Sequence, residues 1–262
     1  MDVFIQSGVQ EMKKVKVNNI KIEQEKFDFG DESSVYKLQG RKRVYKEWNF
    51  RKRSDAKSNE IVLNKVRKLE ILETKENLFK YIVKPKELVE DSYYYTGYTM
   101  QHYDGDKLER YLNYKDTVIL LRKIREALLD LEKNDVMYFD LNYSNILYKK
   151  ENGDIDFRII DIDNSKVEDK EMDFLPPFIQ KYQVSGGKLG KKALIYAYNH
   201  LTVSLLGRFD TRLTLNPYIE TYNRRLDKFR ELADKPKIDS IIDNEYLIDY
   251  YNENQNFKSP LL

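Results

Sequence analysis

The sequence contains no cysteine and only two histidines among its 262 residues. Disulfide bonds and thiolate chemistry are therefore excluded. The two histidines, His102 and His200, lie far apart in the sequence and leave little for a zinc site or a histidine-based catalytic triad. We expect neither of them to act in catalysis. Any catalysis must therefore rely on carboxylates, lysine or a bound metal ion.

The sequence also lacks an excess of either charge and a long apolar run. Its 46 Lys and Arg residues nearly balance 44 Asp and Glu residues, which leaves a formal net charge of +2. This balance removes the argument for nucleic-acid binding through bulk charge, so we expect no nucleic-acid partner. No segment approaches the roughly 18 consecutive apolar residues of a membrane span, and the N-terminus has no apolar signal-peptide core. We expect no membrane partner and a cytoplasmic location.

The spacing of apolar residues predicts an α+β protein. Alternating apolar and polar residues favour strands, whereas apolar residues three or four positions apart favour helices. The predicted strands are short runs within residues 1–50 and the segments 81–83, 87–89, 93–100, 145–148 and 157–160. The predicted helices are 58–74, 117–133, 191–206 and the tail from residue 211 onward.

The change of pattern along the chain predicts a bilobal protein. At about 100–200 residues per domain, the chain is long enough for one large domain or two lobes. Residues 1–100 are expected to form an antiparallel sheet with one helix, and residues 101–262 a mainly α-helical lobe. We expect the two lobes to make one domain in total. The pattern leaves open whether residues 1–25 form an extra strand or a regulatory arm.

Three oxygen-bearing side chains are predicted to lie on loops at strand ends. Asp140 and Asn145 are five positions apart on one loop, and Asp161 ends the strand that returns after the next turn. A hairpin would bring the three together, in an arrangement that suits a hard cation with a carboxylate beside it. The alternative is that they only cap turns, as Asp and Asn often do.

These loops resemble the catalytic and metal-binding loops of the protein kinase superfamily. That family has an Asp, four residues and an Asn, followed by a metal-binding Asp in a D-F-G triplet. The resemblance implies that Asp140 is the catalytic base and that Asn145 and Asp161 hold Mg²⁺. The triplet here reads Asp161-Ile162-Asp163, and we expect Asp163 to be an exposed turn acid rather than a second metal ligand.

The resemblance extends upstream to the segments with which the family binds ATP, and it runs in order from about residue 27 to 206. Gly30 and Ser33 match the second and third glycines of the phosphate-covering loop, and Val35 matches the valine that packs on adenine. Lys46 matches the lysine of the third strand. The resemblance therefore implies that Lys46 contacts the α- and β-phosphates of ATP.

A helix carboxylate and a hinge complete the expected nucleotide site. Glu60 on the only helix of the first lobe would form the ion pair with the strand lysine, and Glu70 fits that role nearly as well. Met100 resembles the gatekeeper residue of the hinge. The backbones of Gln101 and Tyr103 would then face adenine, with ATP bound in the cleft between the lobes.

Several departures from the family pattern concern substrate and regulation. Tyr138-Phe139 replace the usual His-Arg, so no arginine there can read a phosphorylated activation loop. Asn142 stands where Ser/Thr kinases usually have a lysine, which removes a positive charge near the γ-phosphate. Residues 175–178 occupy the A-P-E position without its glutamate, and Leu194 replaces a usual buried Asp.

The resemblance implies a phosphotransferase that uses ATP and Mg²⁺, and we expect it to phosphorylate Ser/Thr hydroxyls of a protein. The alternative enzyme is a small-molecule kinase similar to aminoglycoside and choline kinases, which Asn142 and the missing glutamate favour. A pseudokinase scaffold is less favoured because Lys46, Asp140, Asn145 and Asp161 are all present. The sequence does not identify the acceptor, the mode of regulation or the oligomeric state.

Overall fold

The computed structural model describes residues 11–29, 33–49, 56–108, 112–176, 179 and 189–206. By their contacts the residues form two compact units. The first unit consists of Met1–Asp104 and Arg158–Asp173, and the second of Gly105–Phe157 and Phe174–Leu262. The mixture of helices and strands confirms the predicted α+β class. The segment 158–173, which the sequence analysis grouped with the helical half, is part of the first unit.

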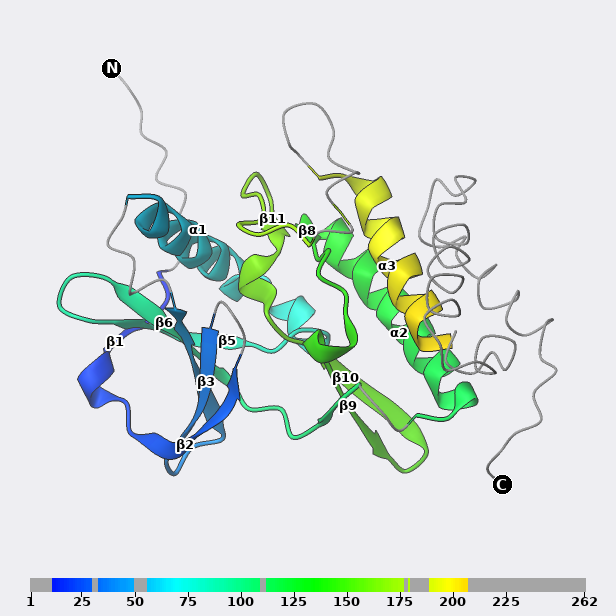
Figure 1. Cartoon of the computed structure of the whole chain (residues 1–262), viewed down its shortest axis with the longest axis horizontal. Coiled ribbons are helices and arrows are strands. Elements are labelled where there is room, and N and C mark those ends of the chain that lie inside the picture. Colours follow the sequence, from blue (N-terminus) through cyan, green and yellow to red (C-terminus); the bar gives the residue numbers. More distant parts are fainter. Residues whose placement is uncertain are drawn as a thin grey trace, which may run out of the picture. The chain divides into compact units, whose positions relative to one another are not determined.

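A six-stranded sheet with the order β1-β5-β6-β4-β3-β2 forms the centre of the first unit (Figure 1). Its strands are β1 (Lys14–Lys16), β2 (Ile22–Phe29), β3 (Ser33–Leu38), β4 (Arg43–Trp48), β5 (Pro85–Glu90) and β6 (Tyr95–Gln101). Strand β1 pairs with β5 in parallel, whereas the other pairs are antiparallel. The sheet is therefore mixed, and the prediction of a wholly antiparallel sheet is wrong on this point. Residues 81–83 contribute only an isolated bridge, between Ile82 and Ile159.

The register of the central strands places several predicted nucleotide residues on one face of the sheet. Val35 lies opposite Lys46, and Lys46 lies opposite Tyr98. Val44 is two positions from Lys46 on β4, and it lies opposite Met100, which is two positions from Tyr98 on β6. Residues that are directly opposite, or two apart on a strand, point to the same face. Val35, Lys46, Tyr98 and Met100 therefore share one face.

The N-terminal arm covers the other face of this sheet. Leu38, Tyr45 and Val89 are buried there. The partly buried apolar residues packed against them are Val15, Val17, Ile20, Ile22 and Tyr36. Between β1 and β2 the arm makes a short 3-10 helix, Val17–Asn19. Of the two possibilities left open by the sequence, the extra strand is thus found for part of residues 1–25.

Helix α1 (Ala56–Glu73) packs against β5 and against residues 162–167 of the first unit (Figure 1). The predicted helix over 58–74 is confirmed. Its buried face contains Leu69 and Leu72, as the helical spacing indicated. The same face also buries two lysines, Lys65 and Lys68, which the pattern of apolar residues did not predict. Short strand β11 (Lys166–Val167) follows in the segment that α1 contacts.

In the second unit, helices α2 (Tyr114–Lys133) and α3 (Lys191–Leu206) lie side by side (Figure 1). The Asn113 side chain caps α2 by accepting a 2.9 Å hydrogen bond from the Asp116 amide. The remaining strands are β7 (Asp106–Lys107), β8 (Val136–Met137), β9 (Ile146–Glu151) and β10 (Asp154–Ile159), with sheet order β10-β9-β7. Both predicted helices and the predicted strand–turn–strand are confirmed, while the predicted tail helix from 211 lies outside the described residues.

Candidate functional site

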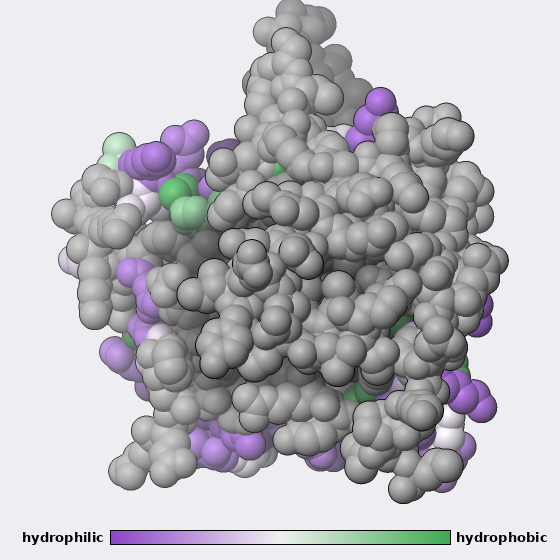
Figure 2. Space-filling model, turned by 45° about the vertical axis from the view of Figure 1, so that its right-hand side comes forward, coloured by the Kyte–Doolittle hydropathy of each residue, from purple (hydrophilic) through white to green (hydrophobic). Residues whose placement is uncertain are grey.

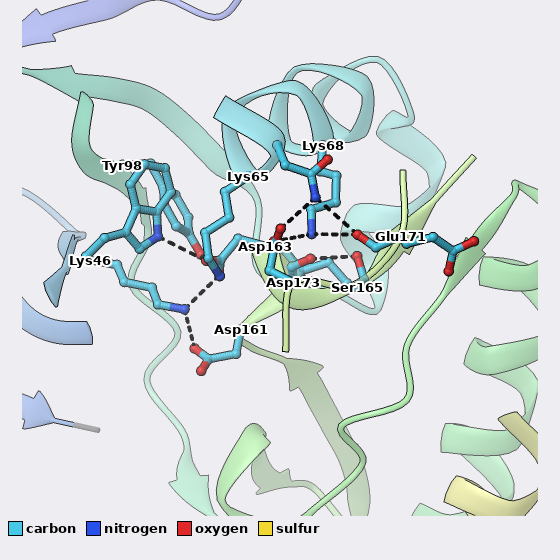
Figure 3. A network of polar contacts seen from close by, with 12 residues as sticks. Lys46, Lys65, Lys68, Tyr98, Asp161, Asp163, Ser165, Glu171 and Asp173 are labelled. Carbon is cyan, nitrogen blue, oxygen red and sulfur yellow. Dashed lines mark hydrogen bonds and ion pairs between the residues drawn. The ribbon is translucent and has the colours of Figure 1, made fainter. Parts of the chain in front are cut away.

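A buried cluster of charged side chains lies between the sheet and α1 in the first unit (Figure 3). The Lys46 ammonium donates to Asp161 Oδ1 at 2.9 Å and to Asp163 Oδ1 at 2.7 Å. Lys46 is 3% exposed, and Asp163 is fully buried. The strand lysine and the Asp that the sequence analysis identified as a metal ligand are therefore brought into direct contact, although 115 residues separate them.

Asp163 is the centre of this cluster. Its Oδ1 accepts hydrogen bonds from Lys46 and from the Tyr98 hydroxyl at 3.1 Å. Its Oδ2 accepts from Lys65 Nζ and from Trp48 Nε1, both at 3.0 Å. A carboxylate offers about four lone-pair sites, so these donors occupy its full capacity. The expectation that Asp163 is an exposed turn acid is wrong, because its four partners come from strands and a helix that the local sequence does not reveal.

Charge balance keeps Lys46 and Asp163 ionised. Burial by itself lowers the pKa of Lys46, but the carboxylates of Asp161 and Asp163 outweigh it and hold the pKa well above its ordinary value. Burial by itself raises the pKa of Asp163, but Lys46 and Lys65 outweigh it and hold that pKa well below its ordinary value. Burial, assisted by Asp163, also raises the pKa of the Tyr98 hydroxyl, which therefore remains a hydrogen-bond donor.

Asp161 differs from Asp163 in exposure and in free capacity. Its side chain is 37% exposed. One oxygen, Oδ1, accepts from Lys46, and no residue in the described ranges donates to the other oxygen, Oδ2. The backbone of Asp161 has φ 60° and ψ 30°, a left-handed conformation that Asp tolerates better than most residues. Of the two acids in the triplet, Asp161 alone retains an oxygen available to a cation.

The structure does not bring Glu60 or Glu70 to Lys46. Glu60 is exposed on α1. Glu70 is half-buried, and burial raises its pKa, while Lys14 of the N-terminal arm opposes that shift. Among the described residues, the ion-pair partners of Lys46 are Asp161 and Asp163. The expected ion pair between Lys46 and a glutamate of α1 is thus not formed by Glu60 or Glu70. Helix α1 contributes Lys65 to the cluster instead.

A second buried pair ties α1 to the end of the same segment. Lys68 Nζ lies 2.6 Å from Asp173 Oδ2, and Asn64 donates to the other carboxylate oxygen at 2.6 Å. Burial lowers the pKa of Lys68, and Asp173 opposes that shift. The side chains of Asn64 and Lys68 also donate to the backbone carbonyl of Glu171. Helix α1 and the segment after Asp161 are therefore held together by charged and polar contacts at two points.

The predicted catalytic loop forms a compact hydrogen-bonded turn in the second unit. Phe139 and Leu141, the neighbours of Asp140 in sequence, are fully buried, whereas Asp140 is half-buried. Asn145 donates to Asp140 Oδ2 at 2.9 Å and to the Asp140 carbonyl at 3.1 Å. The structure thus brings Asp140 and Asn145 together. The Asn145 amide oxygen accepts no hydrogen bond from a described residue, so it is available to a cation.

Asn142 organises this loop, a role that the sequence analysis missed. Its side-chain oxygen accepts from the backbone amides of Ser144 and Asn145 and from the Ser144 hydroxyl. Its amide nitrogen donates to Asp140 Oδ1 at 3.0 Å. The available signal was the preference of Asn for capping the first turn of a helix, here the short 3-10 helix Tyr143–Asn145. Asn142 therefore orients the Asp140 carboxylate from one side, as Asn145 does from the other.

The remaining predicted nucleotide residues are distributed along the first unit. Ser33 is buried at the start of β3, and Met100 is buried near the end of β6. Gln101 is exposed, and Tyr103 is half-buried beneath the guanidinium of Arg158. Gly30 lies outside the described residues. The adenine-binding role of these residues stays a prediction.

The described part of the chain has a largely hydrophilic visible surface and no cluster of metal-binding side chains. No helix within the described ranges has the length and apolar character needed to cross a membrane. Where described residues are visible in Figure 2, hydrophilic residues predominate. No three His, Cys, Asp or Glu side chains in the described part gather closely enough to hold a metal ion by themselves.

Comparisons with known proteins add no family assignment to this geometry. The chain matches no protein-family model and no curated protein. Two clusters of side chains, one around Lys46 and Asp161 and the other around Asp140, are the features that bear on function.

Proposed function

We propose that the chain is an ATP- and Mg²⁺-dependent phosphotransferase with a protein kinase-like fold. The observation that carries this proposal is the 2.9 Å contact between Lys46 and Asp161. The sequence motifs identified these two residues separately, as a phosphate-binding lysine and a metal-binding carboxylate. The two side chains are in contact although 115 residues separate them in the sequence.

The cluster around Lys46 supports a role in binding phosphate. An ammonium group has three N–H donors, and two of those on Lys46 are directed to Asp161 and Asp163. One N–H remains for a phosphate oxygen of ATP. Since the pKa of Lys46 is held well above its ordinary value, the group stays cationic over the whole working range of an enzyme. Val35 and Met100, on the same face of the sheet, would contact the adenine.

The Asp140 loop supports a role in activating the acceptor hydroxyl. In the proposed reaction, the acceptor oxygen forms a bond to the γ-phosphorus, the bond from phosphorus to the bridging oxygen breaks, and ADP leaves. Asp140 takes the hydroxyl proton. Asn142 and Asn145 hold its carboxylate in place. Asn145 and Asp161 each keep an oxygen that could bind Mg²⁺, and the bound cation would neutralise phosphate charge.

Two classes of phosphoryl acceptor are compatible with this site. We propose a Ser/Thr hydroxyl of a protein as the acceptor. A hydroxyl of a small molecule is the alternative, and one observation favours it: Asn142, at the usual lysine position, is engaged inside the loop rather than directed to a substrate. A neutral, engaged side chain leaves no cation there to contact the γ-phosphate of a bound nucleotide.

Phosphoryl transfer with an Asp140→Asn variant tests the proposal. Transfer from γ-labelled ATP with Mg²⁺ is measured on a generic protein substrate and on a panel of hydroxylated small molecules. We expect Asp140→Asn to lower kcat by about 10²–10⁴-fold, because the general base is lost. The matched control is Asp154→Asn, which changes an exposed hairpin acid of the same unit.

The outcomes separate the alternatives. Label on protein that depends on Asp140 supports the protein acceptor, whereas label on a small molecule supports the second class. ATP binding without transfer to any acceptor favours a scaffold. A wild-type protein that neither binds ATP nor transfers phosphate would contradict the proposed function.

A further inference from the structure

We infer that Asp163 is the positioning residue of Lys46, and that it forms the ion pair expected from a glutamate of the helix. The inference rests on the proposed function, because it concerns how the same lysine is held for phosphate. Asp163 contacts Lys46 Nζ at 2.7 Å, the shorter of the two ion pairs of that lysine. Since Asp163 is fully buried, this contact is shielded from solvent and is worth more than an exposed pair.

The hydrogen bonds of Asp163 exclude other roles for it in the reaction. Its two oxygens are fully occupied by four donors, two of which are the neutral groups of Trp48 and Tyr98. Such a carboxylate has no lone pair left for a metal ion and no access to a substrate proton. Asp161, in contrast, is partly exposed and uses one oxygen only. The two acids of the triplet therefore divide the work: Asp161 faces the ligand and Asp163 holds the lysine.

Helix α1 takes part through a positive charge instead of a negative one. Lys65, 1% exposed, donates to Asp163 Oδ2 at 3.0 Å, on the side opposite Lys46. An isolated buried carboxylate would be strongly disfavoured, and two flanking lysines remove that cost. With Asp161 included, two positive and two negative groups balance within the cluster. Lys65 thus holds Asp163 in place, and through Asp163 it acts on Lys46.

The connection between α1 and Lys46 therefore runs through the loop after β10. The same helix is attached to that loop a second time, by Lys68 and Asn64 on Asp173. In this arrangement the lysine, the loop and the helix are linked without any carboxylate from the helix. The chain has acidic residues on α1, but Glu60 is exposed and Glu70 is half-buried, and the ion-pair partners of Lys46 among the described residues are Asp161 and Asp163.

A double-mutant cycle between Asp163 and Lys46 tests the inference. The variants are Asp163→Asn, Lys46→Met and the double variant, and the readouts are kcat/KM for ATP and the dissociation constant of the ATP–Mg²⁺ complex by calorimetry. We expect each single change to lower kcat/KM by at least about 10²-fold. If Asp163 acts through Lys46, the double variant is no worse than Lys46→Met alone. A merely structural role would instead give additive losses.

Further variants keep the test decisive if Asp163→Asn does not fold. Tyr98→Phe removes one hydrogen bond to Asp163 and retains the carboxylate, and we expect a loss of several-fold that also vanishes in the Lys46→Met background. Glu73→Gln, at the end of α1, is the matched control. Additive effects of Asp163→Asn or Tyr98→Phe with Lys46→Met would overturn the inference, as would coupling of Glu60→Gln to Lys46→Met.

The two readouts distinguish this inference from the proposed function. Absence of transfer by the wild-type protein contradicts the proposed function, but the cycle on ATP affinity still measures whether Asp163 acts through Lys46. Normal transfer with additive effects contradicts the inference alone.

Discussion

At the scale of single residues, Asp161 combines a chemical role with a backbone role. Its carboxylate contacts Lys46, and its backbone has φ 60°. A left-handed conformation costs most residues about 1–2 kcal/mol, while glycine adopts it freely and Asp tolerates it. The residue at this position must therefore supply a carboxylate and accept an unusual backbone, which few residue types can do.

Comparison of Asp161→Gly with Asp161→Ala separates these two roles. Both variants lack the carboxylate, so we expect both to lose phosphoryl transfer. Because only glycine accepts φ 60° without strain, Asp161→Gly is expected to unfold with a free energy about 1 kcal/mol higher than Asp161→Ala. Urea denaturation followed by tryptophan fluorescence measures this difference. Equal stabilities, or a more stable alanine variant, would contradict the strain argument.

At the scale of secondary-structure elements, strand β6 passes very close to the strand that carries Lys46. A Cβ atom added at Gly97 would lie 2.0 Å from the backbone carbonyl oxygen of Lys46. Neither backbone can move away easily, because β6 pairs with β4 on one side and β5 on the other. Gly97 therefore permits the close approach of β6 to the backbone of Lys46.

We expect Gly97→Ala to destabilise the first unit by about 1–3 kcal/mol, since the added methyl group forces the two strands apart. The same shift displaces Lys46, so ATP affinity should fall as well. Thermal unfolding and calorimetric titration measure the two effects. The matched control is Gly190→Ala, where the added Cβ meets no atom within 4 Å and the expected change stays below about 1 kcal/mol. A Gly97→Ala variant as stable as the wild type would contradict the clash.

At the scale of the whole molecule, stability should depend on pH through a histidine of α3. Burial lowers the pKa of His200 to about 4, against an ordinary value of 6.5. The folded state therefore favours the neutral imidazole. The free energy of unfolding therefore keeps its full value above pH 6.5. It decreases as the pH falls toward 4, because the unfolded state binds a proton that the folded state does not. The pKa of Asp163 is held below its ordinary value of 3.8. Its ionised carboxylate therefore stabilises the folded state above pH 3.8, and this stabilisation is lost only at lower pH.

We expect the free energy of unfolding to be about 2 kcal/mol lower at pH 4.5 than at pH 7, with His200→Gln removing most of this difference. Urea denaturation of both proteins at the two pH values provides the measurement. A wild-type protein equally stable at both pH values would contradict the buried neutral histidine.

Much of the architecture could be predicted from the sequence because local spacing determines local structure. Helix α3 begins and ends where the apolar spacing indicated, and the hairpin of β9 and β10 lies where alternation and turn residues predicted it. The ordered motifs also identified Lys46, Asp161, Asp140 and Asn145, which the structure brings together in pairs.

The remainder could not be predicted because it depends on partners that are distant in sequence. Lys65 and Lys68 look like solvent-exposed helix residues, yet their carboxylate partners lie 98 and 105 residues later. Asp163 looks like a turn acid for the same reason. Strand β1 could not be paired from its pattern, since three residues of alternating polarity do not specify whether the partner runs parallel or antiparallel.

That short strand also has a consequence for self-association. Without β1, the backbone donors and acceptors of β5 would form an open edge, to which a strand of a second molecule could add. Strand β1 covers this edge and replaces it with one of only three residues, with a lysine at each end. Short edge strands and lysine side chains disfavour strand addition. The N-terminal arm therefore hinders aggregation through the sheet edge while it buries one face of the sheet.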